Sequence, residues 1–278
     1  MPRKYDLHTH STASDGTLTP SKLVALAAAK GIDLLALTDH DTLKGLAAAR
    51  TATAAGAVRV LPGVEISVTW GGRTVHIIGL GIEPRNATLR KGLAGLRAYR
   101  HRRAGEIAHR LAGAGVAGAL EGAQAFANGR PIGRTHFARF LVRRGYAPNE
   151  REVFKHYLVK GKPGHVAGEW VGLGEAVEWI RAAGGQAVIA HPGRYRFPRT
   201  KLLRLIGQFK EPGGVGIEVV SSSHTRDENL LFARYARENH LLASVGSDFH
   251  GPQNPWAKLG ETPPLPAFCT PIWADWGA

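Results

Sequence analysis

Nine histidine, aspartate and glutamate side chains occur at or near the ends of strand-like segments. They are His8, His10, Asp15, His40, Glu65, His76, His191, Asp248 and His250. His8 and His10 form the clearest pair, because alternate residues of a strand point to the same side and two imidazoles can then chelate one ion. So many ionisable groups in one place would destabilise a fold unless cations held them together. We therefore expect a divalent metal centre.

The types of ligand limit which metals can bind and which reactions they can support. With Cys269 as the only cysteine in 278 residues, an intramolecular disulfide and a thiolate cluster are both excluded. Imidazole with carboxylate suits Mn, Fe, Zn or Co. Clustered divalent cations can bridge phosphate oxygens, lower the pKa of a bound water and offset charge as a P–O bond breaks. These residues predict phosphate ester hydrolysis, and the expected catalytic residues are Asp15, His40, Glu65 and Asp248.

The elements that must position these ligands alternate between strand and helix. Apolar runs predict strands over 5–10, 32–38, 58–61, 65–70, 186–190, 215–220 and 242–246, and Gly71-Gly72 predicts a hairpin into 74–79. Helices are predicted over 20–30, 43–55, 174–183, 202–209 and 227–239, the first capped by Thr19 with Pro20 at its first position. Such alternation is typical of a parallel sheet covered by helices, and a barrel is its natural closure at this length. A barrel would gather the carboxyl ends of its strands, and with them the nine ligands, on one face.

One helical segment interrupts the alternation and carries most of the excess charge. The whole chain has a formal net charge of +14. Residues 97–163 contain fourteen Lys or Arg against four Glu, which amounts to +10. We expect a basic helical insertion over 97–168 between barrel segments 1–96 and 169–278, facing an anionic ligand. A plain solvated helical face is the alternative.

The motifs resemble those of the PHP (polymerase and histidinol phosphatase) family. They are His8-Thr-His10, Ser11 to Gly16, Leu37-Thr-Asp-His-Asp41, Pro62-Gly-Val-Glu65, His76, Ala190-His-Pro192 and Gly246-Ser-Asp-Phe-His250. This resemblance covers nearly the whole chain and implies a metal-dependent phosphoesterase on a distorted seven-stranded (β/α) barrel with an inserted helical subdomain. It implies three metal ions: one on His8, His10, Glu65 and Asp248, a second on Glu65, His76 and His191, and a third on Asp15, His40 and His250. It also favours manganese, with zinc or iron as alternatives.

Within the family, the sequence is most similar to a bacterial group that acts on nucleotides and RNA ends. The resemblance implies removal of the 3'-phosphate from nucleoside 3',5'-bisphosphates, converting pAp to AMP. The alternative is 5'-to-3' exoribonuclease activity on short 5'-phosphorylated single-stranded RNA, which the same enzyme could combine with the first. Hydrolysis of histidinol phosphate fits the basic insertion less well. A noncatalytic module or a plain RNA-binding protein would not explain the complete set of ligands.

Substrate contacts are expected partly outside the metal ligands. Arg134, Thr135 and His136 could clamp an anion, because a guanidinium matches a phosphate bidentately. Ser222, Ser223 and His224 follow a predicted strand end, where an ordinary polar loop is the alternative. Asp15 and His40 are expected to touch substrate as well. Asp39 and Asp41 are expected to orient imidazoles.

The ends of the chain carry little chemistry. The N-terminal residues lack the basic, apolar and small-residue regions of a signal peptide, and no apolar run approaches the roughly 18 residues of a membrane span. We expect a cytoplasmic protein that needs neither a membrane nor an obligate protein partner. Residues 263–278, rich in Pro and Trp, should either cap the barrel or mediate contacts.

Overall fold

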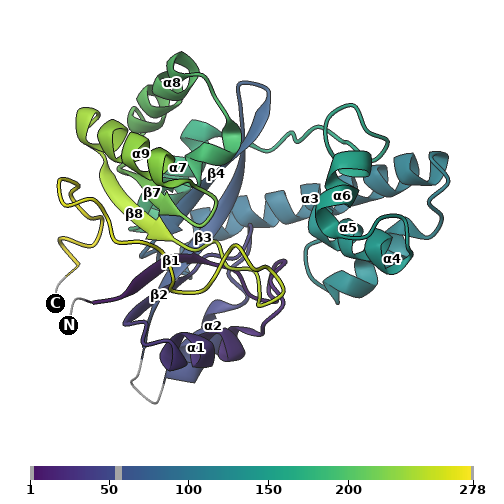
Figure 1. Ribbon diagram of the computed structural model, residues 1–278, viewed down its shortest axis with the longest axis horizontal. Helices are drawn as coiled ribbons and strands as arrows, with labels where there is room; N and C mark the ends of the chain where they lie inside the picture. The colour runs from purple at the N-terminus through teal and green to yellow at the C-terminus, as the bar shows by residue number, and fades with distance from the viewer. Residues whose placement is uncertain (1–2, 54–57, 277–278) are drawn as a thin grey trace. The chain divides into compact units, whose positions relative to one another are not determined.

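The computed structural model of the chain describes residues 3–53 and 58–276 (Figure 1). It divides into two compact units, one formed by Met1–Leu93 with Val171–Ala278 and the other by Ala94–Trp170. The first unit contains a sheet whose strands follow the order β1-β2-β3-β4-β6-β7-β8, and a short β5 pairs with β3. This seven-stranded path is the framework that positions the ionisable cluster.

The strands and helices of the first unit alternate as the sequence predicts. The strands are β1 (Tyr5–Thr9), β2 (Leu34–Leu37), β3 (Arg59–Trp70), β4 (Arg73–Leu80), β5 (Val171–Gly172), β6 (Gln186–Ile189), β7 (Gly216–Ser221) and β8 (Leu242–Gly246). The helices are α1 (Pro20–Ala29), α2 (Leu46–Ala52), α7 (Leu173–Ala182), the short η3 (Pro192–Tyr195), α8 (Arg199–Lys210) and α9 (Arg226–Glu238). The predicted cap of the first helix is present, since the Thr19 side chain accepts a hydrogen bond from the Lys22 amide and Pro20 begins α1. Among the described residues, no helix combines the length and the apolar character that a membrane span requires.

The sheet closes almost completely into the predicted barrel. Thr9 and Phe249 form a parallel bridge between the ends of β1 and β8, and the Asp248 amide donates to the His8 carbonyl over 2.8 Å. The distortion lies at β4, which runs antiparallel to both β3 and β6, whereas the other pairs along the path are parallel. β4 is the second strand of the hairpin that Gly71-Gly72 predicts, and it interrupts an otherwise parallel sheet. The cause is the tight turn at Gly71 and Gly72, whose φ angles of 54° and 73° favour glycine and reverse the chain.

The Pro62-Gly63 pair does not separate two strands as the sequence suggests. Instead β3 runs unbroken from Arg59 to Trp70, and Pro62 is its last residue paired with β2, while Gly63 is its first paired with β4. A Cβ at Gly63 would lie 2.8 Å from Cγ2 of Thr38, so glycine allows the close approach of the two segments. Glu65 consequently lies inside a strand, where its position is set by pairing on both sides.

The C-terminal segment covers the amino end of the barrel, so capping is the alternative that the structure supports. Ala243 bridges to Pro271, and the Ile272 amide donates to the Ala243 carbonyl over 2.9 Å. The indole N–H of Trp276 donates to Gln186 at the first position of β6. These contacts place residues 270–276 across the beginnings of the strands, opposite the ends that carry the metal-ligand motifs.

The second unit is helical and has an apolar core of its own. Its helices are the later turns of α3 (Ala87–Gly113), then α4 (Ala119–Ala127), α5 (Arg134–Arg143), α6 (Glu150–Val153) and the π-helical turn η2 (Phe154–Leu158). Ile107, Leu111, Phe137, Leu141 and Leu158 are almost completely buried in this core. The aromatic residues Phe137 and Phe140 therefore serve packing, which leaves the basic residues to give the unit its surface character.

Gly246, the last residue of β8, has no room for a side chain. An added Cβ would lie 2.3 Å from Cβ of His8 and 2.6 Å from Oε1 of Glu218. Gly246→Ala should therefore lower the free energy of unfolding by about 1–3 kcal/mol, measured by urea denaturation. Gly207→Ala is the matched control: nothing lies within 4 Å of an added Cβ in α8, and alanine should stabilise the helix by about 0.5–1 kcal/mol. Equal stability of the Gly246→Ala protein and the parent would contradict this packing.

Candidate metal centre

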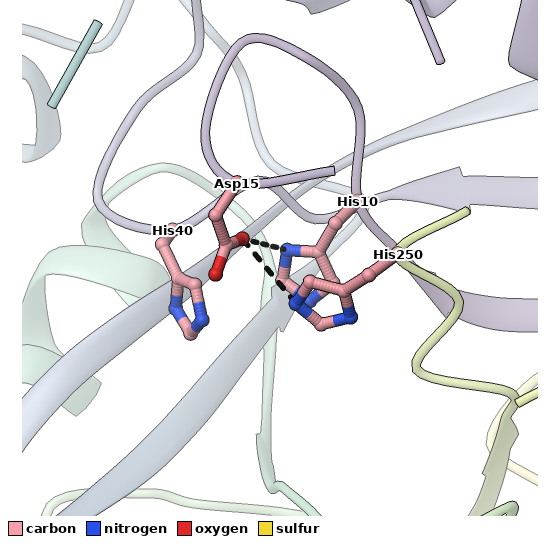
Figure 2. A group of neighbouring side chains, drawn as sticks. All are labelled: His10, Asp15, His40 and His250. Atoms are coloured by element: carbon pink, nitrogen blue, oxygen red, sulfur yellow. Dashed lines mark ion pairs between the residues drawn. The ribbon is translucent and has the colours of Figure 1, made fainter. Parts of the chain in front are cut away.

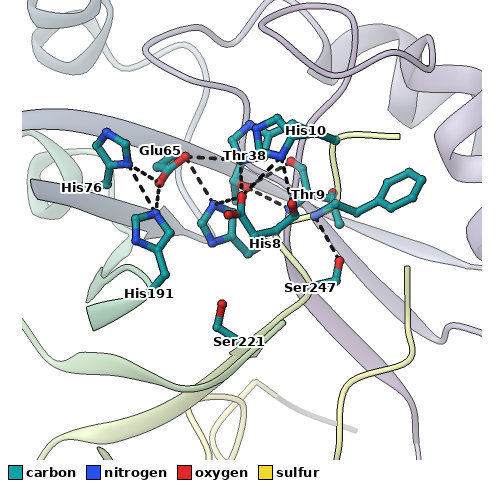
Figure 3. A network of polar contacts seen from close by, with 12 residues as sticks. His8, Thr9, His10, Thr38, Glu65, His76, His191, Ser221 and Ser247 are labelled. Carbon is teal, nitrogen blue, oxygen red and sulfur yellow. Dashed lines mark hydrogen bonds and ion pairs between the residues drawn. The ribbon is translucent and has the colours of Figure 1, made fainter. Parts of the chain in front are cut away.

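The carboxyl ends of the strands in the first unit converge on a cluster of ionisable side chains (Figure 3). The cluster contains all nine expected ligands: His8 on β1, His10 and Asp15 after it, His40 after β2, Glu65 on β3, His76 on β4, His191 after β6, and Asp248 and His250 after β8. Residues up to 242 positions apart in the sequence thus meet in one place, since His8 and His250 belong to the same cluster. We call it the metal-ligand cluster.

Glu65 lies at the middle of the cluster and uses its two oxygens on different neighbours. Its Oε2 lies 3.3 Å from Nε2 of His8, 3.2 Å from Nε2 of His10 and 3.0 Å from Nδ1 of His40. Its Oε1 lies 2.8 Å from Nδ1 of His76 and 2.9 Å from Nε2 of His191. A carboxylate so placed can bridge two cations.

Two further carboxylates, Asp248 and Asp15, each complete a group of ligand atoms, and the two groups share His10. Asp248 Oδ1 lies 3.5 Å from Nε2 of His8 and 3.2 Å from Nε2 of His10, and these ligand atoms with one from Glu65 lie within 4.8 Å of one another. Figure 2 shows the other group, in which Asp15 Oδ1 lies 3.9 Å from Nδ1 of His10 and 3.3 Å from Nε2 of His250. Three groups of ligand atoms, including one of His40, Glu65 and His76, are therefore close enough to hold metal ions.

The donor atoms of the cluster have the environment that cation ligands need. Within the described ranges, the buried atoms that lack a hydrogen-bond partner include Nε2 of His8, both ring nitrogens of His10, Nδ1 of His40, Oε2 of Glu65 and Nδ1 of His191. Leaving a buried polar atom unsatisfied costs about 1–3 kcal/mol, so this concentration is expensive unless another partner binds there. Nitrogen and oxygen donors crowded in this way fit divalent cations.

The charges of the cluster are strongly coupled. Burial disfavours a charged His10, but the nearby carboxylates of Asp248 and Glu65 outweigh burial and raise its pKa to about 10. Burial and the nearby guanidinium of Arg194 lower the pKa of His191 to about 4. Burial likewise disfavours the charged form of Asp248, yet Arg194 and His8 hold its pKa well below the usual range. The carboxylates thus carry negative charge that protons or metal ions must balance.

Strained backbone accompanies several of these side chains. Asp41, His191 and Asp248 have positive φ angles of 51°, 25° and 53°, a region that non-glycine residues rarely adopt. Such conformations persist only where the surrounding structure enforces them, and they concentrate at functional sites. His191 and Asp248 belong to the cluster, and Asp41 accepts a hydrogen bond from the Ser67 amide beside it.

Buried carboxylates outside the cluster fix the loops that carry the ligands. Asp39 accepts hydrogen bonds from the Ser11 amide, the Ser11 hydroxyl and the Ser14 hydroxyl, at 2.8, 2.7 and 2.6 Å. Both oxygens of Asp39 are thus bonded to serine groups on the loop before Asp15, so Asp39 positions this loop, and its role in orienting an imidazole stays a prediction. Asp6 accepts from the amides of Ser247 and Gly260 in a similar way. These bonds determine where the loops can place their ligands.

Glu218 on β7 contacts the cluster from beneath, although it belongs to none of the motifs that the sequence offers. It is completely buried, its Oε1 lies 2.9 Å from Nδ1 of His8, and its Oε2 accepts a hydrogen bond from the His191 amide. It therefore orients His8 so that Nε2 faces Glu65 and Asp248. An acidic residue inside the apolar run 215–220 was the available signal, since glutamate is almost never fully buried unless it is paired.

The loop after β7 and the turn after β6 contact each other. His224 uses both ring nitrogens: Nδ1 donates to the Val219 carbonyl over 3.2 Å, and Nε2 accepts from the Gly193 amide over 3.1 Å. This bond steadies η3, which carries Arg194, and Arg194 Nη2 lies 2.5 Å from Asp248 Oδ2. Ser222 is partly exposed and Ser223 exposed beside them.

The second unit holds a group of arginines around the beginning of α5. The guanidinium of Arg134 is partly buried over the Phe154 ring, 5.6 Å from its centroid, and burial together with Arg100 lowers its pKa. Burial and the charge of Arg134 lower the pKa of Arg103 to about 10, and Nε of Arg103 has no hydrogen-bond partner. His136 accepts the Gly133 amide at Nδ1 and thereby caps α5. Repelling cations held together in this way attract an anion.

Comparison with known sequences gives a consistent family. Residues 6–126 match the model of the PHP domain. The chain is 49% identical to the 3',5'-nucleoside bisphosphate phosphatase of Chromobacterium violaceum, over 97% of this chain and 95% of that protein. It is 43% identical to a 5'-3' exoribonuclease of Haemophilus influenzae, over 98% of this chain and 99% of that protein.

Solved structures agree with the fold. An amidohydrolase from Chromobacterium violaceum, solved with sulfate and without metal, superposes with a TM-score of 0.94 at 49% identity and covers 98% of this chain and 95% of its own. A protein from Bifidobacterium adolescentis described as a metal-dependent phosphoesterase superposes with a TM-score of 0.85 at 27% identity, over 98% of this chain and 94% of its own.

The role of Glu218 can be tested through metal affinity. Glu218→Gln keeps the shape of the side chain but removes the charge that orients His8, so affinity for Mn²⁺ should fall about 10- to 100-fold in a chelator competition assay. Ser244→Ala is the control, because Ser244 is buried opposite Glu218 on β8. Unchanged affinity in a folded Glu218→Gln protein would show that His8 does not depend on this carboxylate.

Proposed function

The chain belongs to the PHP family, and from this we propose that it is a metal-dependent phosphoesterase that removes the 3'-phosphate from nucleoside 3',5'-bisphosphates. The observation that carries the proposal is the convergence of nine metal-ligand side chains on one end of the barrel. The relative from Chromobacterium violaceum that is named for this activity matches almost the whole of both chains. The reaction is the hydrolysis of a phosphate ester, as the ligand set predicts.

The cluster is proposed to hold three divalent ions. His8, His10, Glu65 and Asp248 would bind one, Glu65 with His76 and His191 a second, and Asp15, His40 and His250 a third. The short distances from both oxygens of Glu65 to these imidazoles support its role as the bridging ligand. Manganese is the proposed metal, with zinc or iron as alternatives, because mixed nitrogen and oxygen ligands accept all three.

The side chains of the cluster divide into a buried base and an open edge. His8, His10, Glu65 and Asp248 are at most 1% exposed, whereas His40, His76 and His250 are 15%, 23% and 18% exposed. The substrate phosphate would therefore approach from the open edge, where Asp15 and His40 can contact it. Bound divalent ions would supply Lewis acidity and a water acidic enough to attack phosphorus at neutral pH.

Residues beside the cluster are proposed to hold the substrate. The Arg194 guanidinium is 46% exposed while it pairs with Asp248, so it reaches the cluster and solvent at once and can bind a phosphate oxygen. Ser222 and Ser223 can add hydroxyl donors, and His224 fixes the turn that presents Arg194. In the second unit, Arg134 with Thr135 and His136 is proposed to bind a phosphate, supported by its crowding with Arg100 and Arg103.

Exoribonuclease activity is the second candidate. It rests on the relative from Haemophilus influenzae that is named for that activity and matches nearly end to end. Both reactions break a bond between phosphorus and a ribose 3' oxygen, so one metal centre could serve both, with short 5'-phosphorylated single-stranded RNA as the second substrate. We propose that the enzyme meets these substrates in the cytoplasm and needs no obligate protein partner.

The two candidates are separated by a direct comparison of substrates. Mn²⁺-loaded protein should hydrolyse adenosine 3',5'-bisphosphate to AMP with a kcat/KM at least about 100-fold above that for a 5'-phosphorylated RNA pentamer in the same buffer. Chelation should abolish both reactions, because bound metal ions would lower the pKa of the attacking water. Stepwise release of mononucleotides from the pentamer at comparable kcat/KM would make RNA trimming a principal activity. If the protein hydrolyses neither of the two substrates, the proposal is rejected.

The role of Arg134 is tested by a change that keeps its length but removes its charge. Arg134→Gln should raise KM for the bisphosphate about 10- to 100-fold and change kcat less, because a bidentate phosphate contact is lost. Arg143→Gln, in the last turn of the same helix, is the control. Equal KM values for the two variants would remove Arg134 from the binding site.

A further inference from the structure

A cleft of about 610 Å³ opens at the amino end of the barrel. Tyr5, Leu34 and Arg59, the first residues of β1, β2 and β3, lie in register with one another along one wall. The C-terminal segment forms the other wall through Pro271, Trp273, Ala274 and Trp276, and the lining is completed by Arg3 and Asp33. Its volume falls within the range of about 300–1,000 Å³ that small-molecule sites occupy.

The aromatic walls of the cleft are held in place before any ligand binds. The Tyr5 and Trp273 rings pack with centroids 4.6 Å apart and planes inclined by 44°. The indole N–H of Trp276 donates to Oε1 of Gln186 over 2.7 Å. All three rings are partly exposed and also pack on the apolar cluster beneath them. Rings fixed in this way lose little conformational freedom when a planar ligand stacks on them.

The charge of the cleft is unbalanced in favour of cations. Arg3 and Arg59 are exposed at its rim, and within residues 3–53 and 58–276 neither takes part in an ion pair. The one acidic residue of the lining, Asp33, accepts a hydrogen bond from the Lys4 amide over 2.6 Å. Two guanidinium groups beside three aromatic rings suit a ligand that joins a planar ring to a phosphate.

We propose that this cleft binds a nucleotide unit, with its base stacked on the aromatic walls and its phosphate held by Arg3 and Arg59. The ligand could be a free nucleotide or a nucleotide within single-stranded RNA, which offer the same chemistry. The site is separate from the metal-ligand cluster, because Tyr5 begins β1 and His8 lies three residues further along the same strand, about 10 Å away. The proposal therefore stands or falls independently of the phosphoesterase activity.

Calorimetry of full-length, chelator-treated protein with AMP provides the test. The parent should bind one AMP in the cleft in addition to any bound at the cluster. Arg59→Ser and Trp273→Leu should each weaken the cleft site about 10-fold or more, because each removes a phosphate contact or a stacking surface. Arg226→Ser and Trp256→Leu are matched controls, since both residues are exposed and outside the cleft.

The outcomes distinguish the ligand sources and can reject the site. Competition by a penta-adenylate with a 5'-hydroxyl would support an RNA segment as the natural occupant, and AMP binding without such competition would support a free nucleotide. Arg59 is exposed, so Arg59→Ser should keep its melting temperature and its metal-dependent hydrolysis even if Trp273→Leu fails to fold. The proposal is overturned if Arg59→Ser binds AMP with the same affinity and stoichiometry as the parent.

Discussion

The carboxylate of Glu65 is the contact on which the first unit is centred. Its two oxygens lie within 3.3 Å of nitrogens from five histidines, which come from four different strands or the loops that follow them. A buried carboxylate is costly unless it is paired, so the strands that bring these groups together must also supply its partners. The barrel meets this requirement because its strands end at one face.

Hydrogen bonds from residues around the cluster fix the positions of its side chains. Glu218 holds the imidazole of His8 and the amide of His191, so one carboxylate couples two parts of the cluster. Asp39 and Asp6 secure the loops that follow β1 and β8. Positive φ angles at His191 and Asp248 show that the backbone accepts strain to direct these side chains inward. Catalytic sites depend on such support, since small displacements of a ligand weaken both metal binding and orientation of the substrate.

The two ends of the barrel have different characters for a physical reason. At the carboxyl ends, short loops leave acidic and imidazole side chains pointing into a common space. At the amino ends, the C-terminal segment pairs with β8 and places indole rings across the strand beginnings. The proposed metal centre and the proposed nucleotide cleft would thus lie at opposite ends of the barrel within one unit.

The sequence alone was enough to pick out the nine side chains that meet in the cluster and the order of strands and helices, because His-x-His spacing, caps and apolar runs are local signals. It could not show that β3 continues through Pro62 and Gly63 or that β4 also pairs antiparallel with β6, since both follow from pairing with strands that are remote in the chain. The sequence marks Glu218 as an acidic residue in an apolar run, but its partner His8 and the aromatic cleft become visible only in the tertiary structure, because they depend on neighbours in space. Local patterns determine which residues can do chemistry, and tertiary packing decides which of them meet.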